Sequence, residues 1–88
     1  HRVDDFASWK AVFDERRDRR RASGERGYRL YQVEGDPNNV IAIFEWDEME
    51  NAHAFFESSE LGDAMQRAGV AETPEIHFMN EAESGSTQ

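Results

Sequence analysis

The chain has no cysteine among its 88 residues, which excludes both disulfides and thiolate metal ligands. Its three histidines are scattered and show no spacing of the His-x-x-x-His kind, so the sequence predicts no metal site. A chain of this length buries only about 60–65% of the surface that its unfolded form exposes. Small domains are usually stabilised by disulfides, a metal or a partner subunit. Because the first two are excluded here, we expect stabilisation by a partner subunit.

The sequence also lacks positive net charge and long apolar runs. A net charge of −9 argues against a nucleic-acid partner, because such proteins gain most of their affinity by neutralising phosphates. No apolar run approaches the roughly 18–20 residues of a membrane span, and no signal-peptide pattern opens the chain. We therefore expect a cytoplasmic protein with neither nucleic-acid nor membrane partners.

One domain is expected over residues 1–80, because no linker or internal repeat divides the chain. Residues 81–88 are small and polar and are predicted to form a disordered tail. The sequence starts at His1, close to the apolar Val3, so we expect a first strand that is truncated.

An amphipathic helix is predicted early in the chain. Three apolar residues have helical spacing: Phe6, Trp9 and Phe13. Asp4 and Asp5 are N-cap candidates, and Gly24 is a natural C-terminal stop. The arginine-rich run 16–21 is predicted to be a solvated helix end, where positive charge suits the helix dipole.

A hairpin is predicted to follow this helix. Residues 27–34 and 39–46 are rich in aromatic and β-branched residues, which is typical of strands, and residues 35–38 have turn composition. With a loop at 35–38, the register places Glu45 opposite Tyr28.

A second helix is predicted in two parts. Asp47 and Glu50 have the spacing of a capping box, and the pattern restarts at Ser58 and ends at Gly69. The first part has an apolar stripe that includes a histidine: Met49, Ala52, His53 and Phe56. Residues 74–80 are predicted to be a last strand, which gives an α+β chain in the order β-α-β-β-α-β, the ferredoxin-like arrangement with an antiparallel sheet.

The strand around residues 40–44 predicts a homodimer. All five of these residues are apolar, so we expect both faces of the strand to be buried. Two helices can cover only one face of such a sheet. We expect a second copy of the chain to cover the other face.

Three runs of the sequence carry a family resemblance: Arg2-Val3-Asp4-Asp5-Phe6-x-x-Trp9-Lys10-x-x-Phe13-Asp14, then Asp36-Pro37-Asn38-x-Val40 through Phe44-Glu45-Trp46, and Glu60-Leu61-x-x-Ala64-Met65-x-x-Ala68-Gly69-Val70 followed by Pro74-Glu75-Ile76. The chain resembles the small dimeric α/β-barrel proteins that are grouped with antibiotic-biosynthesis monooxygenases and often labelled "cyclase". The resemblance covers almost the whole chain and implies the ferredoxin-like fold and the dimer. It leaves the reaction open, because the fold hosts several activities.

The resemblance also implies a chemistry that needs no metal, flavin or other cofactor. In the enzymes of this group, a phenolic or quinol substrate supplies the electrons for oxygenation once it is deprotonated. The pocket then needs a base or hydrogen-bond donors and an apolar cage. Of the asparagine, tryptophan, arginine and tyrosine that the better-known enzymes use, only Trp46 matches a recognisable context.

Three residues are candidates for catalysis. His53 is predicted to face the space between helices and sheet, either as a pocket base or as a boundary histidine bonded to a carbonyl. Tyr28 and Glu45 are candidate relays, and the alternative for Glu45 is a rim residue that reaches solvent. Four aromatic residues are candidate walls for a hydrophobic or aromatic ligand, or alternatively core: Trp46, Trp9, Phe44 and Tyr31. The roles of His1 and His77 stay open.

Two further readings remain beside that of a small-molecule pocket protein. The chain is alternatively a non-enzymatic dimer, stress-related or ligand-sequestering, in which Trp9, Phe13 and other apolar residues fill the core. A haem enzyme is a third reading, although no free proximal histidine is evident. Whether the protein is an enzyme is left open.

Overall fold

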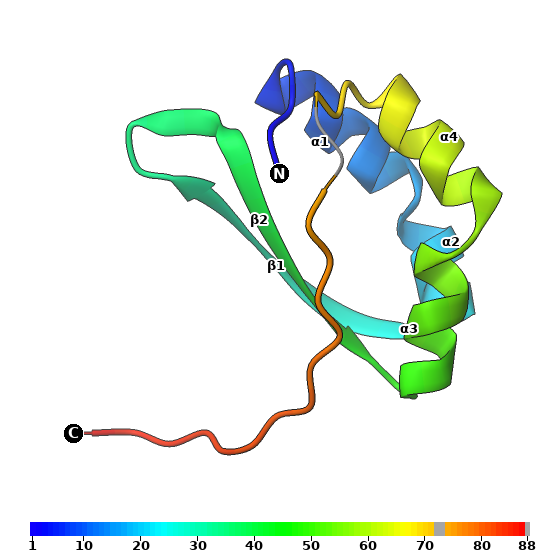
Figure 1. Cartoon of the computed structure of the whole chain (residues 1–88), viewed down its shortest axis with the longest axis vertical. Helices are drawn as coiled ribbons and strands as arrows, with labels where there is room; N and C mark the ends of the chain where they lie inside the picture. Colours follow the sequence, from blue (N-terminus) through cyan, green and yellow to red (C-terminus); the bar gives the residue numbers. More distant parts are fainter. Residues whose placement is uncertain (72–73, 88) are drawn as a thin grey trace.

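The computed structural model describes residues 1–71 and 74–87 as a small α+β fold (Figure 1). The elements in chain order are α1 (Phe6–Glu15), α2 (Arg17–Ser23), β1 (Glu25–Val33), β2 (Asp36–Trp46), α3 (Met49–Phe56) and α4 (Ser59–Arg67). The two strands form an antiparallel hairpin, and the four helices lie on one side of it. In the part of the chain that the structure describes, no helix combines the length and apolar character needed to cross a membrane.

The predicted first helix is two helices, and its ends are where the sequence places them. Asp5 is the N-cap, and its Oδ2 accepts a hydrogen bond of 3.0 Å from the amide of Ser8. The helix breaks at Arg16, whose φ of −96° and ψ of 9° leave the helical region. Gly24 ends α2 with a φ of 118°, a conformation that glycine adopts without strain.

The hairpin forms as predicted, but its turn and register differ from the prediction. The turn is at Glu34 and Gly35, where Gly35 has a φ of 79°, and not at residues 35–38. Tyr28 therefore pairs with Phe44, one residue away from the predicted Glu45. The physical reason is an irregularity in the pairing next to the turn, which absorbs residues 37–39 of β2 without partners in β1.

The second helix is broken in two, as predicted, although its start differs. The expected capping box is wrong, because Glu48 is the N-cap of α3 and makes no side-chain cap. Asp47 instead accepts hydrogen bonds from the amide of Glu48 (2.7 Å) and from the side chain of Asn51 (3.0 Å). Ser58 caps α4 through a hydrogen bond from the amide of Leu61 at 3.3 Å.

The expected first and last strands are reduced to short contacts. Arg2 pairs with Asn39 and Val3 with Val70 in isolated antiparallel bridges, so the N-terminal residues lie between β2 and the segment after α4. Residues 74–80, predicted to be a strand, have no regular secondary structure. The regular sheet among the described residues is therefore the hairpin alone.

The core lies between the hairpin and the helices. Its buried residues come from four parts of the chain: Val3, Trp9, Phe13, Val40 and Ala68. Trp9 and Phe13 stack with ring centroids 5.1 Å apart, and Val40 is fully buried. The partly buried Tyr28 and Phe44 pack against this cluster, so the face of the hairpin that carries them is the helix-covered face.

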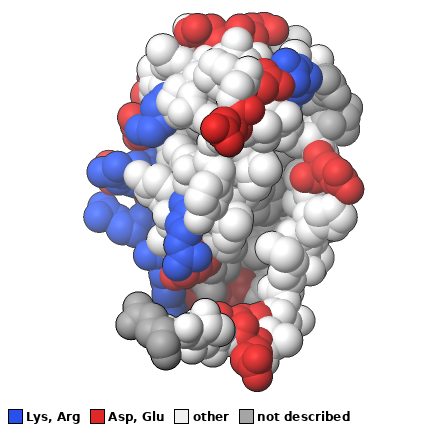
Figure 2. Space-filling model, turned by 90° about the vertical axis from the view of Figure 1, so that its left-hand side faces the viewer, with Lys and Arg blue, Asp and Glu red and all other residues white. Residues whose placement is uncertain are grey.

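The opposite face of the hairpin, which we call the outer face, carries exposed apolar side chains. Tyr31 and Ile41 are cross-strand partners and are 50% and 49% exposed. Val33 is also exposed, and Ile43 is half-buried. Figure 2 shows one side of the molecule, and much of its centre is neither acidic nor basic. Residues 40–44 are thus apolar on both faces, as the sequence indicates, but helices cover only one.

A buried ion pair, which the sequence does not predict, joins α2 to β1. Arg20 is 3% exposed, and its Nε lies 2.8 Å from Oε2 of the buried Glu25. Arg20 also donates to the carbonyl of Phe13 at 2.5 Å, and its guanidinium lies 3.7 Å from the centroid of that ring. The expectation that the whole run 16–21 is a solvated helix end is therefore wrong at Arg20.

Candidate functional site

An apolar groove runs along β2, and we call it the β2 groove. It lies between β2, α3 and the irregular segment 74–81, and its volume is about 670 Å³. The segment 74–81 descends past the hairpin in Figure 1. A volume of this size is typical of small-molecule sites, which range from about 300 to 1,000 Å³.

Aromatic rings from three parts of the chain surround the groove. The ring of Phe56 on α3 lies 5.7 Å from that of Phe44, 6.0 Å from that of Trp46 and 6.0 Å from that of Phe78. All four residues line the groove. Such a wall favours a flat apolar ligand, because offset and edge-to-face ring contacts add to simple burial.

The free edge of β2 supplies polar groups to the same groove. The amino group of His1 donates to the carbonyl of Val40 at 2.7 Å, and the amide of Val40 donates to the carbonyl of His1 at 2.8 Å. Backbone groups alternate in direction along a strand, so those of Ala42 and Phe44 point to the same side as those of Val40. No backbone hydrogen bond from outside the hairpin reaches Ala42 or Phe44 within residues 1–71 and 74–87.

One end of the groove is negatively charged. Asp47 lines it, and the hydrogen bond from the Asn51 side chain holds the pKa of this carboxyl below its ordinary value of 3.8. Asp47 is therefore ionised at neutral pH and accepts hydrogen bonds. A hydroxyl or amine on a ligand would find an acceptor at this end.

His53 does not face the interior, which corrects the sequence prediction. The buried residues of α3 are Ala52 and Phe55, and His53 is exposed. The reason is a rotation of this eight-residue helix, which directs Phe55 inward where the sequence pattern favoured His53. The imidazole stacks on Phe78 with centroids 3.8 Å apart. His53 thus lies behind a wall of the groove and is not among the residues that line it.

Tyr28 and Glu45 are not brought together. Tyr28 lies on the helix-covered face, where its ring is 5.0 Å from that of Phe13 and its hydroxyl accepts a hydrogen bond of 3.1 Å from Arg17. Glu45 is exposed on the outer face and lies 3.7 Å from Arg29. The one-residue difference in register is the cause, because it moves Glu45 to the opposite face of the sheet.

The four predicted wall residues divide among three places. Phe44 and Trp46 line the β2 groove. Trp9 is buried in the core, as the alternative reading expects, and Tyr31 is exposed on the outer face. The two open histidines both line the groove: His1 with its ring 5.6 Å from Trp9, and His77 with Nε2 2.9 Å from Glu75.

Phe78 is the wall residue that sequence reasoning missed as a ligand contact. The sequence carries a signal for it, because Ile76, Phe78 and Met79 make the segment 74–80 apolar, but that pattern by itself predicts only a strand. Among residues 1–71 and 74–87, no group of three or more His, Asp and Glu side chains could hold a metal ion.

In comparisons with models of protein families, with curated proteins and with solved structures, the chain matches none of them.

Proposed function

We propose that this chain is a small-molecule-binding protein whose β2 groove holds a flat, hydrophobic or aromatic ligand. The observation that carries the proposal is the ring of aromatic side chains around a hollow of about 670 Å³. The free backbone groups of Ala42 and Phe44 and the carboxylate of Asp47 favour a ligand with a hydroxyl or carbonyl at its edge. The phenols and quinols implied by the resemblance have this chemistry.

Oxygenation or cyclisation of such a ligand is the reaction that we propose if the groove supports turnover. His53 does not line the groove, so we assign it the role of positioning Phe78, on which its ring stacks. Replacing His53 by alanine should therefore weaken binding and leave the oligomeric state unchanged. Unchanged binding of a confirmed ligand by this variant would contradict this role.

Ligand binding can be tested with 1-naphthol as a flat phenolic probe. Trp46 lies in the groove and Trp9 in the core, so saturable quenching of tryptophan fluorescence should report binding. Phe78→Ser should weaken binding several-fold, because it removes one ring contact from an exposed segment with little effect on folding. Tyr31→Ser, a matched aromatic change on the outer face, should leave binding unchanged. Equal effects of the two substitutions, or no saturable binding, would contradict the proposal.

A homodimer through the outer face is the second candidate function. The exposed pair Tyr31 and Ile41, with Val33 and the half-buried Ile43, is an apolar face that no helix of the described chain covers, and Ile41 and Ile43 also border the β2 groove. We propose that two such faces pack together as in a dimeric α/β barrel. The finer assignment of the fold as ferredoxin-like is part of this proposal, supported by the bridges that place residues 1–3 between β2 and Val70.

The dimer can be tested by sedimentation equilibrium. Tyr31→Lys should shift the population to monomer, because it places a charge in the centre of the proposed interface. Gln66→Lys, at an exposed residue of α4, should not. A monomeric wild type at 100 μM would refute the interface.

A further inference from the structure

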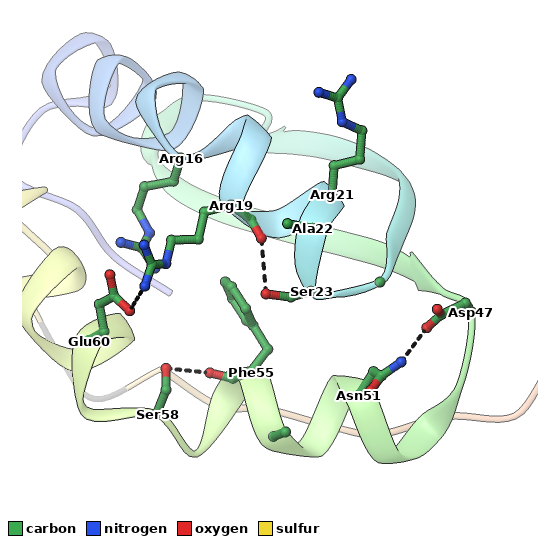
Figure 3. A pocket seen from close by; sticks show the side chains of 12 residues that line it. Arg16, Arg19, Arg21, Ala22, Ser23, Asp47, Asn51, Phe55, Ser58 and Glu60 are labelled. Atoms are coloured by element: carbon green, nitrogen blue, oxygen red, sulfur yellow. Dashed lines mark hydrogen bonds and ion pairs between the residues drawn. The ribbon is translucent and has the colours of Figure 1, made fainter.

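A second hollow, which we call the arginine hollow, lies between α2, α3 and the start of α4. Its volume is about 480 Å³. Figure 3 shows the side chains of Arg16 and Arg19 extending into it and the ring of Phe55 pointing up from α3, whereas Arg21 points away. The arginine hollow and the β2 groove are lined by different residues of α3 and share only Asp47 among the residues that line them, so the proposal below does not rest on the function proposed above.

Arg16 has no anionic partner in the described part of the chain. It is half-buried, and its guanidinium carbon lies 6.0 Å from the centroid of the Phe55 ring. Its neighbours in the same run are paired: Arg19 with Glu60, and Arg21 with Asp18 at 3.2 Å. A half-buried guanidinium without a carboxylate is notable in a chain with 19 acidic residues and ten basic ones.

Neither acidic group that lines the arginine hollow is paired with Arg16. Glu60 accepts from Arg19, and Asp47 accepts from Asn51 and from the amide of Glu48. The guanidinium of Arg16 is therefore available to a ligand. The charges that face the hollow balance, with Arg16 and Arg19 against Asp47 and Glu60, so the unpaired guanidinium of Arg16, and not a net positive charge, favours an anion.

We propose that the arginine hollow binds a small organic anion, a carboxylate or phosphate monoester attached to an apolar body. A guanidinium presents parallel N–H donors that match both groups in a bidentate manner. The hollow is larger than a bare oxyanion needs, and Ala22, Ala54 and Phe55 supply apolar surface for the rest of the ligand. In the bound state Arg16 holds the anionic group, and the ring of Phe55 contacts the body.

Four probes separate the contributions of charge and body. Benzoate and phenyl phosphate carry both, benzyl alcohol lacks the charge, and inorganic phosphate lacks the body. Titrations followed by amide chemical shifts should show benzoate and phenyl phosphate binding with shifts at Phe55 and in α2. Benzyl alcohol and inorganic phosphate should bind at least tenfold more weakly. Equal affinity for benzoate and benzyl alcohol would overturn the proposal.

Three variants test the assignment of residues. Arg16→Gln should weaken benzoate binding tenfold or more, in line with the loss of charge-assisted hydrogen bonds. Arg29→Gln removes the same charge from the outer face and should have no effect. Glu60→Gln should tighten binding, because it releases Arg19 for the ligand, a gain that a purely structural role would not produce. Thermal unfolding of each variant establishes that it is folded. Equal losses in Arg16→Gln and Arg29→Gln, or no gain in Glu60→Gln, would overturn the assignment.

Discussion

The buried ion pair between Arg20 and Glu25 should make Arg20→Met one of the most destabilising single changes in this chain. Methionine retains the length of the apolar stem, so the change removes mainly the guanidinium. That group bonds to Glu25 at 2.8 Å and to the carbonyl of Phe13 at 2.5 Å, and lies 3.7 Å from the Phe13 ring centroid. Its removal leaves the carboxylate of Glu25 buried without its cation.

The expected cost is about 3–5 kcal/mol in the free energy of unfolding at pH 7.5, which is typical when one partner of a buried pair is removed. A small domain has a total stability on the order of 5–10 kcal/mol. The variant should therefore retain only a small part of its stability. Arg29→Met is the matched control, because Arg29 and its partner Glu45 are 64% and 63% exposed and 3.7 Å apart. An exposed pair of this kind is worth at most about 1 kcal/mol.

The cost of Arg20→Met should depend on pH with a definite sign. Burial raises the pKa of Glu25 above its ordinary value of 4.5, against the attraction of Arg20, which lowers it. An acid whose pKa is raised by folding adds to the free energy of unfolding. This contribution is fully present below pH 4.5 and is lost as the pH rises through the pKa of Glu25 in the folded state. Without Arg20 this pKa rises further. The difference between variant and wild type should therefore widen between pH 4.5 and 7.5.

Urea unfolding followed by tryptophan fluorescence measures these differences, since Trp9 is buried and Trp46 half-buried. Work above pH 4.5 avoids the titration of four aspartates whose pKa values hydrogen bonds lower below 3.8: Asp5, Asp14, Asp36 and Asp47. If Arg20→Met does not fold at pH 7.5, Glu25→Gln in the same chain should restore folding by removing the unpaired charge. A loss below about 1 kcal/mol at pH 7.5, or an equal loss at both pH values, would refute the reasoning.

Three further changes test local features by the same urea assay. Gly24→Ala should lower the free energy of unfolding by about 1–3 kcal/mol, because the φ of 118° is strained for alanine and an added Cβ would meet the carboxylate of Asp47. Gly62→Ala is the control: it lies in open space on α4 and should raise the free energy of unfolding by about 0.5–1 kcal/mol. Val40→Ala should cost about 2 kcal/mol, since Val40 is fully buried, and a loss below about 0.5 kcal/mol would contradict its place in the core. Ser58→Ala should cost about 1 kcal/mol through loss of the α4 N-cap, and an unchanged midpoint would show that the cap contributes nothing.

The β2 groove and the outer face both follow from the small number of paired strands. β2 has β1 on one edge, while residues 74–80 run beside its other edge without forming a strand. The same strand presents Val40 to the core and Ile41 to the outer face. Ile41 and Ile43 of this strand belong both to the outer face and to the lining of the groove, so a ligand and a partner would lie next to each other, and Tyr31→Lys separates them because Tyr31 does not line the groove.

Local chemistry determined much of the fold from the sequence alone. Asp5 begins the first helix and Gly24 ends the second, because a cap and a positive φ depend on neighbouring residues only. The break at Ser58 and the hairpin were predicted for the same reason. The apolar character of residues 40–44 on both faces is likewise a property of the strand itself.

Only the tertiary structure decided which side chains meet. The irregular pairing beside Gly35 shifts the register by one residue and separates Glu45 from Tyr28, and no local preference encodes that shift. The orientation of α3 depends on packing against Trp46, which contacts Phe55 at 5.2 Å, and it leaves His53 exposed. The burial of Arg20 depends on Glu25 and Phe13 arriving from other elements. Short-range preferences therefore determined the elements, and long-range packing determined the site.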